Sequence, residues 1–177
     1  RKKGFDVLLE AAERLKQSWP DLVVAIAGDG DLRAELDRQA AAGGIVRLLG
    51  NRSQDEIAAL CAAADIVAVP SVRDDAGNVD GLPNFALEAL ASATPVVATR
   101  VGGLPQAITD GETGLLVAER DSAGLAEALN CLLGDPIRRA AIGRAARASV
   151  ETRFGWSRVA ERLEAAYGPA PSRTHLS

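Results

Sequence analysis

The chain has 177 residues, of which 47% are hydrophobic but only 3% aromatic, so alanine, leucine and valine must fill its core. This length is typical of one domain with a sizeable core. The formal net charge of −4 argues against nucleic acid as a partner. No apolar stretch reaches the roughly 18 residues that indicate a membrane-spanning helix. Cys61 and Cys131 lie in helix-like runs without paired spacing, which predicts two buried thiols in a reducing, cytoplasmic compartment.

Five apolar runs without strict alternation predict strands that are buried on both faces of a parallel sheet. They are residues 22–27, 45–49, 66–69, 96–98 and 115–117. Helical periodicity predicts helices at 5–19, 32–42, 54–63, 84–92, 104–109, 122–133, 137–151 and 157–167. The alternation of strands and helices therefore predicts an α/β fold with a doubly wound parallel sheet, of the Rossmann-like kind.

The first predicted helix has no strand before it. In the common strand order 3-2-1-4-5-6 the first strand is central, so its truncation would leave the runs at 22–27 and 66–69 without a partner between them. The chain also lacks methionine, and we expect it to be a segment of a longer protein, less stable than the parent domain. We assign residues 1–168 to the domain and residues 169–177 to a disordered tail.

Residues 80–99 form the most informative motif, DGLPNFALEALASATPVVAT. Asp80 precedes a Gly-Leu-Pro turn, a helix that carries Glu88 and a buried strand. Free amides at a helix start suit a phosphate, and carboxylates suit sugar hydroxyls, so the motif predicts a nucleotide-sugar site. Pro83 is expected in the first helical turn, where its missing N–H does no harm. The residues expected to contact the donor here are Gly81, Leu82, Asn84 and Phe85.

Lys3 and Gly4 precede the first predicted helix. A lysine at this place can reach a phosphate at the carboxyl ends of the strands, where open α/β sheets bind ligands. The alternative is a solvated lysine near the end of the chain.

Two acidic segments suggest metal binding, but neither pattern fits. Residues 28–31 could be a dinucleotide fingerprint or a D-x-D metal clamp. The fingerprint fails because Arg33 stands at its third glycine position, and the metal clamp is not needed because a helix N-cap explains Asp31. In the segment 74–80 an EF-hand would need Glu at the position of Leu87. We expect no metal, and a flexible loop over the site instead.

Asp80 and Glu88 can also be considered as the acid and base of a hydrolase. On one helix, eight residues would separate their backbones by ~12 Å. Glycosidase carboxyl groups lie about 5–9.5 Å apart. The spacing favours two separate hydroxyl contacts. His175, the sole histidine, falls in the expected tail, so no catalytic histidine is predicted.

The motifs together resemble the C-terminal domain of retaining GT-B glycosyltransferases, group 1 or family four. The resemblance extends from Lys3 to about Val117, and the final helices are similar to the family's return toward its partner domain. Its marks, in family order, are K-G, A-G-D-G-D-L-R-A-E-L, L-G-N-R-S, A-D-I-V-A-V-P-S, the motif at 80–99, V-G-G-L-P-Q and D-G-E-T-G-L-L-V.

The resemblance implies a role for each site residue. Glu88 would accept hydrogen bonds from the ribose, and Asp80 would contact the donor sugar. Lys3 would neutralise the departing diphosphate together with the amides near Asn84. The loop at Asn51 and Arg52 would lie against the base. No cofactor or metal is implied beyond the nucleotide-sugar.

The implied activity is transfer of a hexosyl-type sugar from a UDP- or GDP-type donor with retention. The acceptor, lipid-linked or a carbohydrate, would bind a missing N-terminal domain, with the whole protein in the cytoplasm or at the inner membrane face. We therefore expect no transfer by this chain alone. A non-catalytic nucleotide-sugar-binding module and a GT-B-like epimerase are the alternatives. Asp80 and Gln106 depart from the family pattern, which has Glu at both places, and an arginine that usually lies just before K-G is missing.

Overall fold

The computed structural model describes residues 2–29, 36–38 and 44–168. The predicted Asp31 cap, most of the helix predicted at 32–42, the tail and His175 lie outside these residues. The strands of the described part are β1 (Val24–Ala27), β2 (Val46–Gly50), β3 (Val67–Val69), β4 (Val96–Thr99) and β5 (Leu115–Val117). Its helices are α1 (Phe5–Leu15), α3 (Gln54–Ala63), α4 (Asn84–Ala91), α5 (Leu104–Ala107), α6 (Ser122–Gly134), α7 (Pro136–Arg153) and α8 (Trp156–Tyr167).

All five predicted strands are present and pair in parallel, which confirms the α/β fold. They form two sheets in the described part of the chain, one of β1 and β2 and one in the order β3-β4-β5. Every residue of β4 is buried. Val96 and Ala98 pack into one apolar cluster and Val97 into another, as expected for a strand with helices on both faces.

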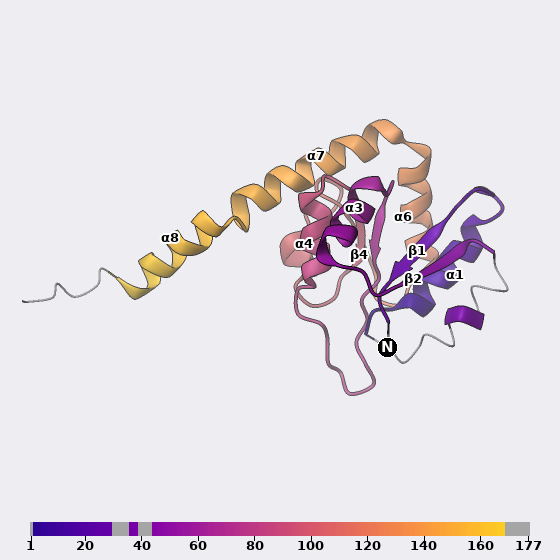
Figure 1. The fold of residues 1–177 in the computed structure, drawn as a ribbon, viewed down its shortest axis with the longest axis horizontal. Coiled ribbons are helices and arrows are strands. Elements are labelled where there is room, and N and C mark those ends of the chain that lie inside the picture. Colours follow the sequence, from indigo (N-terminus) through magenta and orange to yellow (C-terminus); the bar gives the residue numbers. More distant parts are fainter. Residues whose placement is uncertain (1, 30–35, 39–43, 169–177) are drawn as a thin grey trace, which may run out of the picture.

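The helices cover the three-stranded sheet from both sides (Figure 1). Apolar residues of α3, α4 and α5 belong to the cluster on one face, and those of α1 and α6 to the cluster on the other. Helix α7 continues from α6 and packs on α4, and α8 extends away from the body (Figure 1). In this arrangement the starts of α1 and α4 lie where β3 and its neighbours end.

Helix α1 ends at Leu15, four residues before the predicted end. The amides of Ser18 and Trp19 both donate to the Leu15 carbonyl, which closes the helix in a turn. The Trp19 indole N–H donates to Asn130 Oδ1 of α6 at 2.8 Å. The apolar stripe therefore continues past the helix because Trp19 packs against α6 from the turn.

The prediction of two buried thiols is half wrong. Both cysteines are free, but Cys61 is buried in α3 whereas Cys131 is exposed on α6. Cys131 lies in an alanine- and leucine-rich run whose buried members are Leu125, Ala126, Leu129 and Leu132. Its position on the opposite side of the helix places it at the surface.

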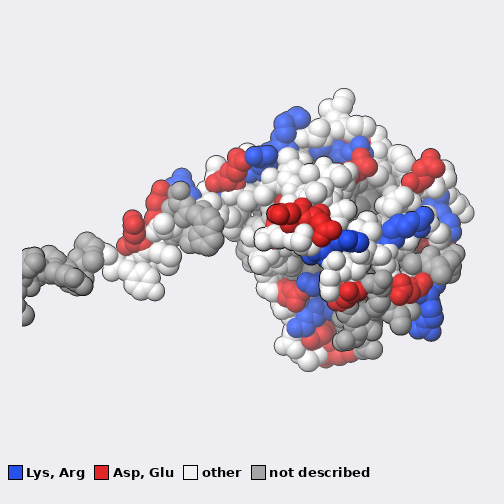
Figure 2. Space-filling model, in the orientation of Figure 1, with Lys and Arg blue, Asp and Glu red and all other residues white. Residues whose placement is uncertain are grey.

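Charged side chains of both signs are interspersed on the face shown in Figure 2. On α7, Arg147 pairs with Glu151 one turn further along the helix at 2.8 Å. Within the described residues, no helix combines the length and the apolar character required to cross a bilayer.

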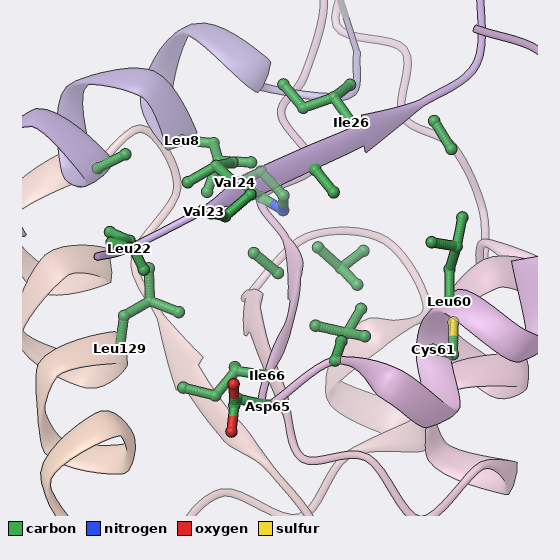
Figure 3. Close-up of a pocket in the computed structure, with 18 of the residues that line it drawn as sticks. Leu8, Leu22, Val23, Val24, Ile26, Leu60, Cys61, Asp65, Ile66 and Leu129 are labelled. Carbon is green, nitrogen blue, oxygen red and sulfur yellow. The ribbon is translucent and has the colours of Figure 1, made fainter. Parts of the chain in front are cut away.

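A groove of about 1050 Å³ separates the two sheets (Figure 3). Residues 24–27 of β1 line one wall, and residues 66–69 around β3 line the other. Among the described residues β1 pairs only with β2, and β3 only with β4. These are the two runs that the sequence predicts to lack a partner between them.

Candidate functional site

The start of α1 holds Lys3 at the end of β3. Gly4 is the N-cap of α1 and has φ 61°. A Cβ at this position would overlap the Pro70 carbonyl, so both the left-handed conformation and the close approach require glycine. The Val72 amide donates to the Lys2 carbonyl at 2.9 Å and ties the same segment to the chain beyond β3.

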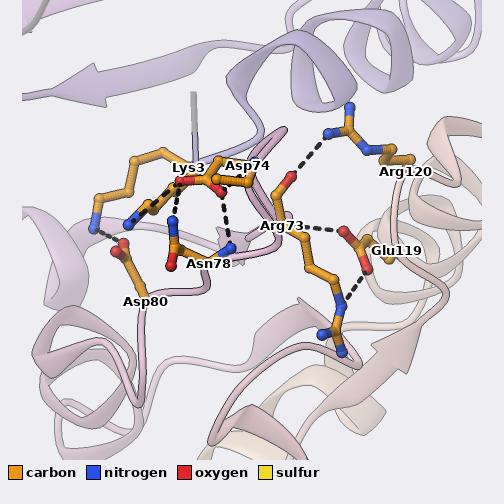
Figure 4. A network of polar contacts seen from close by, with 9 residues as sticks. Lys3, Arg73, Asp74, Asn78, Asp80, Glu119 and Arg120 are labelled. Carbon is orange, nitrogen blue, oxygen red and sulfur yellow. Dashed lines mark hydrogen bonds and ion pairs between the residues drawn. The ribbon is translucent and has the colours of Figure 1, made fainter.

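The structure brings Lys3 and Asp80 together. The Lys3 ammonium lies 2.8 Å from Asp80 Oδ2 (Figure 4). The Lys3 side chain is 59% exposed and that of Asp80 29%. The two residues, 77 positions apart in sequence, thus form an ion pair that solvent reaches from the lysine side.

The acidic loop before Asp80 is organised by Asp74. Its carboxylate accepts hydrogen bonds from the amides of Asn78 and Ala76, at 2.8 and 3.0 Å. These bonds, first that from Asn78, hold the pKa of Asp74 below its usual value. Asp74 also lies 3.7 Å from the Lys2 ammonium. The Asp74 carboxylate therefore stabilises the conformation of its own loop. No cluster of potential metal ligands occurs among the described residues.

Sequence reasoning missed the residues that hold the beginning of this loop. Glu119, just after β5, accepts a hydrogen bond from the Arg73 amide at 2.6 Å and pairs with its guanidinium at 3.3 Å. Arg120 donates to the Arg73 carbonyl at 2.9 Å (Figure 4). No local pattern marks these partners, because they are 46 and 47 positions away from Arg73.

The start of α4 differs slightly from the prediction. Pro83 is the N-cap, and the helix begins at Asn84 with no side chain capping it. The Ala86 amide donates to the Pro83 carbonyl, whereas the first amides of a helix have no partner within it. The amides of Asn84 and Phe85 consequently stand at an N-terminus that attracts anions.

Glu88 is half-buried one turn into α4 and faces the groove. It lines one end of the groove together with Lys3, Pro83 and Phe85. Burial, and secondarily the negative charge of Glu88, raises the pKa of the Cys61 thiol. Most of the other lining residues are apolar, although Asp65 and Arg139, an ion pair with 3.0 Å between its atoms, also line the groove.

Asn51 and Arg52 lie on a separate support, the loop after β2. Asn51 Oδ1 accepts a hydrogen bond from the Asp29 amide at 3.1 Å, which joins the loops after β1 and β2. Arg52 donates to the Leu49 carbonyl at 2.7 Å and to Glu56 at 3.2 Å. The guanidinium is thus directed into its own loop and the first turn of α3. Neither residue is among those that line the groove.

One end of the groove therefore combines a cation, an uncapped helix start and a half-buried carboxylate, a set that can hold a ligand with phosphate and hydroxyl groups. The sequence model of the family "Glycosyl transferases group 1" matches residues 1–135. The chain belongs to this family. The resemblance seen in the sequence motifs is thereby confirmed.

Two bacterial glycosyltransferases are similar to most of the chain. The chain is 42% identical over 179 residues to a D-inositol 3-phosphate glycosyltransferase of Corynebacterium aurimucosum, which covers 96% of the chain and 41% of the relative. It is 40% identical to a GDP-mannose-dependent monoacylated alpha-(1-6)-phosphatidylinositol monomannoside mannosyltransferase of Corynebacterium glutamicum, over 92% of the chain and 43% of that protein. The chain thus spans about two fifths of the length of these relatives.

Two solved structures share the fold. The C-terminal domain of LpcC, a group 1 glycosyl transferase of Francisella tularensis, superposes with a TM-score of 0.76 at 29% identity, over 88% of the chain and 81% of that domain. The Anabaena protein HepE in complex with UDP-glucose superposes with a TM-score of 0.78 at 28% identity, over 93% of the chain and 46% of that protein.

Proposed function

We propose that the chain is the donor-binding part of a glycosyltransferase that moves a hexosyl-type sugar from a UDP- or GDP-type nucleotide-sugar to an acceptor with retention. The observation that carries this proposal is the Lys3–Asp80 pair beside the uncapped start of α4 and the half-buried Glu88. The UDP-glucose bound to HepE and the GDP-mannose dependence of the mannosyltransferase relative support the donor class.

In this proposal each group has a defined task. A diphosphate at the start of α4 competes with Asp80 for the Lys3 ammonium, because both are anions within reach of one cation. The ammonium and the amides of Asn84 and Phe85 then stabilise the negative charge that grows on the departing diphosphate. Asp80, released from Lys3, accepts hydrogen bonds from the sugar hydroxyls.

The nucleoside is assigned to residues further from the reacting bond. Glu88 accepts hydrogen bonds from the ribose hydroxyls, because its half-buried carboxylate is an acceptor without donor capacity when ionised. The backbone of Gly81 and Leu82 borders the diphosphate, and the Asn51–Arg52 loop borders the base. No metal takes part, since the lysine and the helix start supply the positive charge.

The remaining machinery is assigned to a larger protein. We propose an N-terminal domain that binds a lipid-linked or carbohydrate acceptor, in the cytoplasm at the inner membrane face. An additional strand of that protein would enter the groove between β1 and β3 and pair with both. Among the described residues, each of these strands has one edge without a strand partner. This assignment predicts no transfer by the chain alone.

Replacement of Glu88 by Gln tests the ribose contact. Loss of a hydrogen bond to a charged group should weaken binding of a nucleotide-sugar by ~1.5–3 kcal/mol. Calorimetry with UDP-glucose and GDP-mannose measures this change on the chain and on the Glu88→Gln variant. Glu127→Gln, on the exposed face of α6, is the matched control and should bind as the wild type does. Equal affinity of the Glu88 variant would remove this residue from the site.

Product analysis separates transfer from the other functions. The chain with a labelled donor and a phosphatidylinositol mannoside should give neither transferred sugar nor an epimer. The same assay on a protein that joins the chain to the N-terminal part of the C. glutamicum relative should give transfer. An epimer would identify an epimerase, and binding without either product would identify a binding module.

A further inference from the structure

The turn between β4 and α5 forms a support beneath the Asp80 loop. The Gly103 amide donates to the Gly81 carbonyl at 2.8 Å. Gly102 has φ 58°, and a Cβ there would overlap the carbonyl oxygens of Asp80 and Gly81. A Cβ at Gly103 would lie 2.8 Å from Leu82 Cβ. The backbone of the turn and that of residues 80–82 are therefore closer than any side chain allows.

The turn itself is fixed to the centre of the three-stranded sheet. The Thr99 hydroxyl, fully buried at the end of β4, donates to the Ser71 carbonyl at 2.5 Å. The Arg100 amide donates to the Val117 carbonyl of β5 at 2.9 Å. Val101 and Leu104, on either side of the two glycines, are buried as well. The support therefore has little freedom to shift if it is crowded.

Gln106 adds a second contact to the turn. With its amide oriented so that the nitrogen faces the neighbouring carbonyls, it donates to the Gly103 oxygen at 3.0 Å and to the Gly102 oxygen at 3.2 Å. A glutamate at this position has no hydrogen to donate when ionised. The amide at position 106 thus stabilises the turn in a way that a carboxylate does not.

We propose that Gly102 and Gly103 are positioning residues, which set the place of Asp80 and of the backbone leading into α4 relative to Lys3. The inference rests on the proposed function, because it concerns the diphosphate and sugar contacts of that site. It adds two residues that touch no donor group themselves. Their effect passes through the backbone of residues 80–82, while Glu88 lies further along α4.

Gly102→Ala tests the proposal against Gly111→Ala. Gly111 has φ 81° and open space around it, so the control carries the same backbone strain without the overlap. Calorimetry should find UDP-glucose and GDP-mannose binding about tenfold weaker for Gly102→Ala, equivalent to ~1.4 kcal/mol. Affinity for the bare nucleosides uridine and guanosine, measured by NMR titration, should stay unchanged in both variants. A purely structural defect would weaken nucleoside and nucleotide-sugar alike, and that result would overturn the proposal.

A ligand-free measurement keeps the proposal separate from the proposed function. In two-dimensional NMR spectra, Gly102→Ala should shift the amide signals of Gly81, Leu82 and Lys3 and leave that of Ser53 in place. If the wild-type chain binds no nucleotide-sugar, the proposed function fails, while these shifts still decide whether the turn positions the loop. Unshifted signals at residues 81 and 82 would overturn the positioning role of Gly102.

Gln106→Glu is the second variant, in case Gly102→Ala does not fold. It should weaken binding of the nucleotide-sugars and leave nucleoside binding unchanged. The effect should be smaller than that of Gly102→Ala, because the variant removes hydrogen bonds from the turn without crowding it. Unchanged nucleotide-sugar affinity in a folded Gln106→Glu variant, together with unshifted signals at residues 81 and 82, would contradict the positioning role.

Discussion

The two sheets differ in how completely they are packed. The three-stranded sheet has apolar clusters on both faces, and its middle strand β4 is buried throughout. The two-stranded sheet takes part in a small cluster, in which Ile26, Ile45 and Val46 pack with Ala12 of α1, and Val23 just before β1 is 61% exposed. Both sheets have one edge on the groove, but only the three-stranded sheet has an apolar cluster on each of its faces.

This difference divides the proposed donor site between two supports. Asp80, the start of α4 and Glu88 are held by the three-stranded sheet through the turn at Gly102 and the packing of α4. Asn51 and Arg52 are held by the two-stranded sheet. The part assigned to the diphosphate is therefore fixed more firmly than the part assigned to the base. Substitutions in the two regions should reveal this contrast.

The largest expected effect is that of Leu90→Ala. Leu90 is 1% exposed in the cluster between α4 and the three-stranded sheet, so the cavity should cost about 2–5 kcal/mol of unfolding free energy. Leu22→Ala, at a partly buried position before β1, should cost clearly less. Urea denaturation of both variants measures the contrast. Equal losses would show that the two regions are packed equally well.

Next in size is Thr99→Val. The change keeps the branched shape but leaves the buried Ser71 carbonyl without its donor, at a cost of ~1–3 kcal/mol. Thr152→Val is the matched control, because that hydroxyl donates to a helix carbonyl at an exposed position. Thermal unfolding of both variants should show a clear loss for Thr99 only. If Thr152→Val lost as much stability, the buried hydrogen bond of Thr99 would contribute no more than an exposed one.

A smaller effect is expected at the helix that follows the two-stranded sheet. The Ser53 hydroxyl accepts a hydrogen bond from the Glu56 amide, and Glu56 accepts one from the Ser53 amide, so the two form a capping box. Ser53→Ala should cost ~1 kcal/mol in chemical denaturation. A loss as large as that of Leu90→Ala would indicate that the region around β2 depends on local bonds far more than its packing suggests.

The smallest effect is a pH dependence at the same helix start. The hydrogen bond from the Ser53 amide, more than any other contact, lowers the pKa of Glu56 from its ordinary value of 4.5. Because the folded pKa is lowered, this stabilisation is present above 4.5 and is lost as the pH falls through the folded value. The Glu56→Gln variant should therefore lose less unfolding free energy than the wild type as the pH falls, which denaturation at a series of pH values measures. An identical pH dependence of the unfolding free energy in wild type and variant would exclude a contribution from Glu56.

Local sequence patterns predicted most of the fold but not its contacts. The runs at 96–98 and 115–117 became β4 and β5 because unbroken apolar residues are stable only between two layers of helices. The end of α1 was misplaced because Trp19 follows the same stripe while packing from a turn. The exposure of Cys131 depended on which side of α6 meets the body, which composition does not determine.

The candidate site divides in the same way. Asp80, Glu88 and the start of α4 are recognisable from one short motif, since a turn, a proline and a helix are local features. The Lys3–Asp80 pair, the Glu119–Arg73 contact and the support by Gly102 join positions many residues apart. Their partners depend on which loops meet at the ends of parallel strands.

The sequence by itself determined the alternation of strands and helices, the family and the acids of the proposed site, because periodicity and turn chemistry act over a few residues. Only the tertiary structure decided which cation meets Asp80, which glycines lie beneath it and where the sheet is interrupted. Those facts arise from backbone packing between distant segments, and a hydrogen bond or a close approach across 20 or more residues leaves no mark in the local pattern.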